Sequence, residues 1–163
     1  MINQPIAQLP ADTPVGMGQA TFAAEPTRLT TILGSCVAVT LYSPRRRRGM
    51  LCHVVLPQSR NSSENPAKYA DTAVPHMLST LRSEGIGHGE LTAKIVGGAC
   101  MFGTGQTSRI GDSNVDATVH ALAAAGIGIA ARDSGGNTGR RICFDLATGL
   151  ISITSVGHPP RTI

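Results

Sequence analysis

The feature that most constrains the fold of this chain is a succession of short apolar runs separated by Gly, Pro and polar clusters. Runs of this kind, rich in Val, Ile and Leu, are typical of β-strands. They predict strands at 17–23, 27–33, 36–42, 49–56, 91–96, 127–132, 141–146 and 150–156. Two segments have helical signals instead: apolar residues recur at helical spacing in 71–83, and a capping-box pattern at Ser113 and Asp116 predicts a helix that stops at Gly126.

Many strands with two helices predict an α/β fold, a layered sandwich around a mixed or mostly antiparallel sheet. A chain of 163 residues suits one domain with one core. Residues 1–16 are rich in Pro, Gln and Ala without a period and indicate a flexible leader. We therefore expect a single domain over 17–156 and a C-terminal tail over 157–163.

The charge of the chain is concentrated in one place. Net charge is +4, and Arg45, Arg46, Arg47 and Arg48 form one uninterrupted run in a predicted turn. The run is either a solvated turn or a docking patch for an acidic partner surface. A nucleic-acid binder is disfavoured, because a second basic cluster is missing and aromatic residues are only 3% of the sequence.

Three sequence features that are missing limit the location of the protein and its cofactors: a long apolar run, a secretory signal and a C-x-x-C pair. The longest apolar run, 121–131, is shorter than the roughly 20 residues that a spanning helix needs, so we expect no membrane insertion. The N-terminus does not resemble a secretory signal, which favours the cytoplasm and reduced cysteines. The four cysteines form no C-x-x-C pair, and neither a metal nor another cofactor is predicted.

One pair of residues suggests chemistry. Cys36 follows Gly34 and Ser35, and His53 lies on the next predicted strand, after a short turn. Such a hairpin places Cys36 opposite or diagonal to His53, where an imidazole could take the proton of a thiol. Strand alternation turns Cys52 to the other face, away from His53, which also argues against a metal site. Spacing alone leaves the alternative open that Cys36 is a small core residue and His53 a structural one.

Several segments, taken in order, resemble the CheD family of chemoreceptor glutamine deamidases. The resemblance covers about residues 16–156, nearly the whole predicted domain, and the ordered set is far more specific than any single segment. The segments are Leu33-Gly34-Ser35-Cys36-Val37-Ala38-Val39, His53-Val54-Val55-Leu56-Pro57, Lys68-Tyr69-Ala70-Asp71-Thr72-Ala73, Ala93-Lys94-Ile95-Val96-Gly97-Gly98-Ala99, Met101-Phe102, Ile110-Gly111 with Asn114-Val115, and Asp133-Ser134-Gly135-Gly136-Asn137.

The resemblance implies an α/β sandwich similar to the catalytic domain of cytotoxic necrotizing factors, with a Cys–His–Thr arrangement. It assigns the nucleophile to Cys36, the base to His53 and the orienting threonine to Thr30. On this reading strand alternation turns the neighbouring Thr31 to the opposite face. Backbone amides near Gly34 and Ser35 are expected to support the oxyanion.

The implied activity is hydrolysis of glutamine side chains on methyl-accepting chemotaxis receptors to glutamate, with release of ammonia, in support of chemotactic adaptation. The same chemistry would extend to glutamyl methyl esters. Expected partners are the cytoplasmic domains of these receptors, and the arginine run would then face an acidic receptor coiled coil. The alternative function is a non-catalytic or dual-role regulatory partner of a CheC-type phosphatase.

Overall fold

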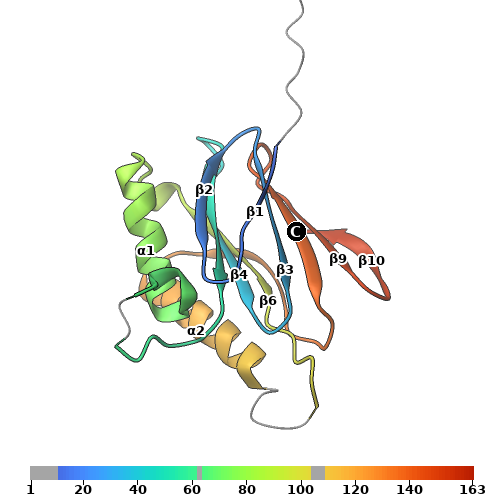
Figure 1. The fold of residues 1–163 in the computed structure, drawn as a ribbon. Helices are drawn as coiled ribbons and strands as arrows, with labels where there is room; N and C mark the ends of the chain where they lie inside the picture. Colours follow the sequence, from blue (N-terminus) through green and yellow to red (C-terminus); the bar gives the residue numbers. More distant parts are fainter. Residues whose placement is uncertain (1–10, 62–63, 104–108) are drawn as a thin grey trace, which may run out of the picture.

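The computed structural model describes residues 11–61, 64–103 and 109–163, which form two packed β-sheets and one layer of helices (Figure 1). Sheet A has the strand order β1-β3-β8-β9-β10, and sheet B has the order β2-β5-β4-β6-β7. Sheet A consists of β1 (Asp12–Pro14), β3 (Arg28–Leu33), β8 (Arg140–Asp145), β9 (Ile151–Ser155) and β10 (His158–Thr162). Sheet B consists of β2 (Ala20–Ala24), β4 (Val37–Ser43), β5 (Arg48–Val54), β6 (Thr92–Gly97) and β7 (Ile129–Ser134).

Both sheets are mixed. The pairs β1/β3 and β6/β7 are parallel, and the other neighbouring strands are antiparallel. The expected α/β sandwich with two main helices is therefore confirmed, although the strands are divided between two sheets. The predicted hairpins at 43–48 and 147–149 are also present, joining β4 to β5 and β8 to β9.

The helices α1 (Ala70–Ser83) and α2 (Ile110–Ala124) cover the face of sheet B that points away from sheet A (Figure 1). Short 3-10 helices, η1 (Pro66–Lys68) and η2 (His88–Glu90), flank α1. Two apolar cores result, because each face of sheet B is buried. One lies between sheet B and the helices and includes Val37, Val39 and Leu41; the other lies between the sheets and includes Ala38 and Leu51.

Alternation along β5 follows the sequence-based expectation. Met50, Cys52 and Val54 pack in the core beneath the helices, whereas Leu51 packs between the sheets and His53 shares its side of the strand. Cys52 therefore points away from His53, as predicted. Its thiol donates to the carbonyl oxygen of Ala67 at 3.2 Å, and burial raises its pKa to about 12.

The structure corrects both predicted ends of the domain. The expected leader contains β1 and the buried Val15, and the expected tail contains β10; residues 1–10 lie outside the described ranges. A three-residue strand such as β1 is too short to show a period. In β10, Pro159 and Pro160 disfavour a strand, but an edge position with a register shift accommodates them.

The predicted start of the second helix is also wrong. The helix α2 begins at Ile110, after an Arg109 that provides no side-chain cap, so Ser113 lies inside it. Close packing accompanies the earlier start: a Cβ at Gly111 would lie 2.6 Å from the carbonyl oxygen of Gly98. Glycine at 111 therefore lets the first turn of α2 rest against the end of β6.

Candidate functional site

The segment Gly34–Cys36 carries the chain from β3 in sheet A to β4 in sheet B, and its backbone is held by neighbouring elements. Ala99 N–H donates to the carbonyl oxygen of Gly34 at 2.9 Å, and Gly98 N–H donates to that of Cys36 at 2.8 Å. The Asn114 side chain donates to the carbonyl oxygen of Ser35 at 3.0 Å. All three carbonyl groups of Gly34–Cys36 are therefore fixed, and we call this segment the nucleophile loop after the role that the resemblance implies for Cys36.

Glycine at position 97 is required by the approach of the nucleophile loop. Gly97 has a φ of +114°, and a Cβ there would lie 2.3 Å from the carbonyl oxygen of Cys36. A side chain at this position would push the Cys36 backbone away from β6. The Gly97-Gly98 pair therefore serves close backbone packing.

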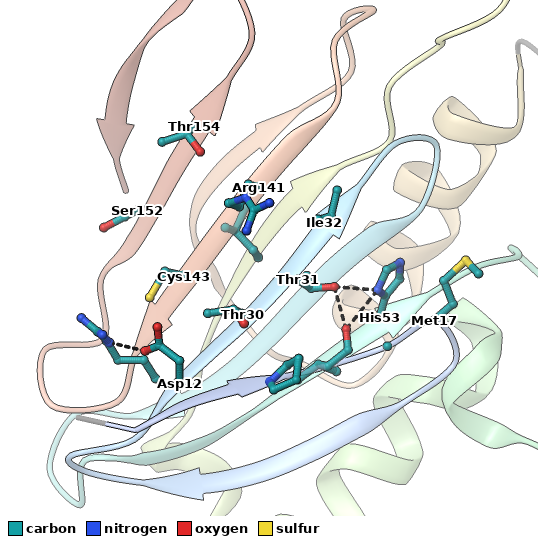
Figure 2. Close-up of a pocket in the computed structure, with 15 residues that line it drawn as sticks. Asp12, Met17, Thr30, Thr31, Ile32, His53, Arg141, Cys143, Ser152 and Thr154 are labelled. Carbon is teal, nitrogen blue, oxygen red and sulfur yellow. Dashed lines mark hydrogen bonds and ion pairs between the residues drawn. The ribbon is translucent and has the colours of Figure 1, made fainter. Parts of the chain in front are cut away.

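His53 lies between the two sheets, and its side chain is oriented by one threonine (Figure 2). Only 3% of the residue is exposed. The Thr31 hydroxyl donates to the carbonyl oxygen of Val15 at 2.7 Å, and its oxygen lies 2.8 Å from His53 Nδ1. Since the single hydroxyl proton is used on Val15, the Thr31 oxygen accepts from Nδ1–H. A second contact of 3.4 Å from Nδ1 to the Val15 carbonyl also requires a proton on Nδ1.

This tautomer leaves His53 Nε2 as an unprotonated acceptor. Nε2 is buried and has no hydrogen-bond partner among the residues that the structure describes. Burial lowers the pKa of His53 from its ordinary value, with a smaller opposing effect from the Val15 carbonyl. The imidazole is therefore neutral near pH 7, as a general base must be.

The expected threonine is wrong by one residue. Thr31, not Thr30, contacts His53, and Thr30 lies on the opposite side of β3 (Figure 2). The reason is visible in the alternation of the strand: Leu29, Thr31 and Leu33 are buried, whereas Ile32 is exposed. Leu29 and Leu33 lie on the same side of β3 as Thr31, so the sequence pattern could have identified Thr31 as the inward threonine.

Cys36 and His53 project from the same face of sheet B. Ala38 is the register partner of His53, and Cys36 lies two positions before Ala38, one residue before the start of β4 at Val37. The half-buried Cys36 packs against the core between the sheets. The structure records no hydrogen bond between the Cys36 thiol and His53. Desolvation raises the pKa of Cys36, so the resting thiol is protonated.

A pocket of about 650 Å³ opens beside His53 along the outer side of sheet A (Figure 2). The wall nearest His53 includes Met17, Thr31 and Ile32, and the pocket extends toward Arg141 and Cys143. Cys36 is not among its lining residues. The exposed side chains of Met17 and Ile32 give the entrance beside the histidine an apolar character.

The other candidate features of the site are less informative. In the described part of the chain, no three His, Cys, Asp or Glu side chains gather as metal ligands would. None of the described helices is long and apolar enough to cross a membrane.

The sequence indicates no role for Asn114, although its amide contacts the nucleophile loop. A buried amide leaves no periodic signal that would reveal its partners.

The family model and the sequence relatives that match this chain both indicate the same family. The family model described as CheD chemotactic sensory transduction matches residues 55–155. Proteins named "Probable chemoreceptor glutamine deamidase CheD" are similar to this chain in Methanococcus maripaludis (strain S2), Desulforamulus reducens and Moorella thermoacetica. Identity is 41%, 41% and 37%, over 91%, 94% and 94% of this chain and 97%, 96% and 96% of the relatives.

A solved structure, the hypothetical protein YfiH of Bacillus licheniformis, is similar at a TM-score of 0.42 and 17% identity, over 71% of this chain and 49% of that one. This likeness is too weak to bear on the fold or the site. The sequence relatives, in contrast, match over nearly their whole length at 37–41% identity, and the family model spans more than half of the chain. The chain belongs to the CheD family.

Proposed function

We propose that this protein deamidates glutamine side chains on the cytoplasmic domains of methyl-accepting chemoreceptors, with Cys36 as nucleophile, His53 as general base and Thr31 as the residue that orients the imidazole. The names of the relatives support the substrate class. The roles of Cys36 and His53 rest on the resemblance and on the geometry of the site; the match to the family model begins at residue 55, after both of them.

One observation carries the proposal. His53 is buried with Nδ1–H donating to Thr31, and its bare Nε2, which has no partner among the described residues, lies on the face from which Cys36 projects. A buried acceptor without a partner is costly, about 1–3 kcal/mol, so proteins rarely keep one without a use. A thiol proton is a suitable partner for this nitrogen when substrate arrives, since catalytic hydrogen bonds often tighten only in the complex.

The reaction follows from these groups. His53 Nε2 takes the thiol proton while Cys36 Sγ forms a bond to the glutamine Cδ. The C–N bond then breaks, and the imidazolium gives its proton to the leaving nitrogen, which departs as ammonia. Water, deprotonated by His53, attacks the thioester, and the thiol leaves with that proton, so glutamate and free enzyme remain. The resting thiol and imidazole are both neutral, and the proton moves only during attack.

The proposal extends to three finer points. A glutamyl methyl ester would pass through the same tetrahedral intermediate, with methanol leaving in place of ammonia. The protein would act in the cytoplasm, where receptor cytoplasmic domains lie, and support chemotactic adaptation. The architecture would be that of the catalytic domain of cytotoxic necrotizing factors, which superposition of the two structures would test.

A CheC-type phosphatase is the candidate for a second partner, in a regulatory role that could accompany catalysis. The observation that favours a protein partner is the exposure of Ile32 and Met101 near the site. Met101 packs close to Gly34, since a Cβ on that glycine would lie 2.7 Å from its sulfur. An apolar border of this kind suits a receptor helix or a segment of another protein.

The deciding experiment incubates the protein with a purified receptor cytoplasmic fragment and maps glutamine-to-glutamate changes by peptide mass, with ammonia release measured in parallel. Conversion at defined glutamines that is lost in Cys36→Ala would support the proposal. Receptor that stays unmodified, combined with binding of a CheC-type phosphatase at the same surface, would support the regulatory role instead.

A further inference from the structure

Asn114 connects the nucleophile loop to the strand that carries the base. It is fully buried on α2, and its Nδ2 donates to the carbonyl oxygens of Ser35 at 3.0 Å and Val55 at 2.9 Å. Carbonyl oxygens only accept, so these two partners fix which end of the amide points at them. One residue on a helix therefore holds the chain immediately before Cys36 and the chain two positions after His53.

These two hydrogen bonds lie just beyond the end of the β4–β5 ladder, where the two chains no longer pair with each other. The β4–β5 ladder ends at the pair Val37 and Val54, and beyond it the two chains follow different partners. Val55 N–H donates to the carbonyl oxygen of Lys68, and the carbonyl of Cys36 accepts from Gly98. Beyond the end of this ladder, Asn114 donates to one carbonyl of each chain.

The bond to Ser35 also sets the direction of the Cys36 amide. Ser35 C=O and Cys36 N–H belong to the same planar trans peptide and point in opposite directions. The carbonyl is drawn toward α2, on the helix side of sheet B, so the N–H is turned toward sheet A, the side of His53. Cys36 N–H donates to no acceptor among the described residues.

We infer that Asn114 is a positioning residue that holds the Ser35–Cys36 peptide with its N–H aimed at the oxyanion formed when Cys36 attacks. The inference rests on the proposed function. The second polar atom of the same side chain supports it, because Asn114 Oδ1 is buried and has no partner among the described residues. An apolar residue would avoid that cost, and exceptions to polar satisfaction concentrate at functional sites.

The test is Asn114→Leu, which keeps the side-chain size and removes both donors, with Asn114→Ala as a second variant in case the first does not fold. Thr118→Val is the matched control, because Thr118 is a buried residue one turn further along α2 whose hydroxyl donates to the backbone oxygen of Asn114 rather than to the nucleophile loop. Each protein is assayed for kcat and KM on receptor fragment and for the rate of Cys36 alkylation by iodoacetamide, followed by peptide mass.

Alkylation occurs at a saturated carbon and forms no oxyanion, so it reports only the thiol and its base. We expect kcat to fall about tenfold or more, toward the 10²–10³ range known for loss of an oxyanion donor, with KM and alkylation close to wild type. Thr118→Val should retain kcat. An unchanged kcat in the Asn114 variants, or a parallel loss of alkylation, would overturn the inference. Activity that survives Cys36→Ala would instead overturn the proposed function.

Discussion

The two ends of the β4–β5 hairpin differ in how their polar groups are treated. At the end next to the nucleophile loop, His53 is buried, and Asn114 and His53 each keep one polar atom without a partner in the described structure. At the turn, Arg46 pairs with Glu90 at 2.9 Å and Arg47 pairs with Glu25 at 3.0 Å, with all four side chains at least partly exposed.

The contrast shows where position matters. Exposed ion pairs contribute little to stability, and a turn can exchange them without consequence. Buried polar groups without partners cost more and are retained only where the surrounding structure holds them. With seven residues in β4, the two ends lie roughly 20 Å apart, so each can be altered without touching the other.

The largest effect should come from the pair at the loop end. Cys36→Ala removes the proposed nucleophile, and His53→Ala removes its proposed base, so each should reduce deamidation to background; losses within one catalytic unit do not add. Ammonia release from receptor fragment is the measurement. Cys52→Ala is the control, because Cys52 lies on the far side of β5 with a pKa of about 12. Near wild-type turnover by Cys36→Ala would disprove the assignment.

A smaller loss should follow when only the orientation of His53 is released. Thr31→Val removes the hydroxyl that accepts from Nδ1–H, so the ring can turn and expose the wrong nitrogen. Since a positioned acid–base group contributes roughly 10²–10⁴-fold, a loss of about tenfold or more in kcat is expected. Thr30→Val makes the same chemical change on the opposite face of β3 and should retain activity. The reverse order of effects would contradict the register of β3.

The pH dependence of kcat/KM tests the charge state of His53. Burial lowers its pKa below the ordinary 6.5, so the protein should keep more than half of its activity at pH 6.5 and lose the rest as the pH falls through that lowered value. Protonated Nε2 cannot take the thiol proton. Any residual activity of His53→Ala should instead rise at alkaline pH, because the pKa of Cys36 is raised above 9.0. An acid limb centred above pH 6.5 would refute the buried neutral base.

Much of this site follows from local patterns, and the remainder does not. The spacing of Cys36 and His53 across a short turn predicts the hairpin, and alternation places Cys52 on the other face; both are confirmed. The resemblance assigns the orienting role to Thr30, whereas the buried Leu29 and Leu33 on the same strand mark the side of Thr31 as the inward one. The contact of Asn114 with Ser35 joins residues 79 positions apart, which no local period encodes.

The smallest effect is expected at the arginine turn, where the two interpretations of the run can be separated. Replacing Arg45 and Arg48 with Ser leaves the ion pairs of Arg46 and Arg47 in place and removes two charges. A docking patch would act on encounter with an acidic receptor, so KM for intact receptor would rise and its dependence on salt would flatten, whereas kcat and turnover of a short glutamine peptide would not change. The turn is roughly 20 Å from the nucleophile loop, and half of its charges are already paired. We therefore expect the run to behave as a solvated turn. Turnover of the short peptide should not change, and KM on receptor should change at most a few-fold. A fall in kcat on the short peptide would contradict both interpretations, since it would mean that the two ends of the hairpin are coupled.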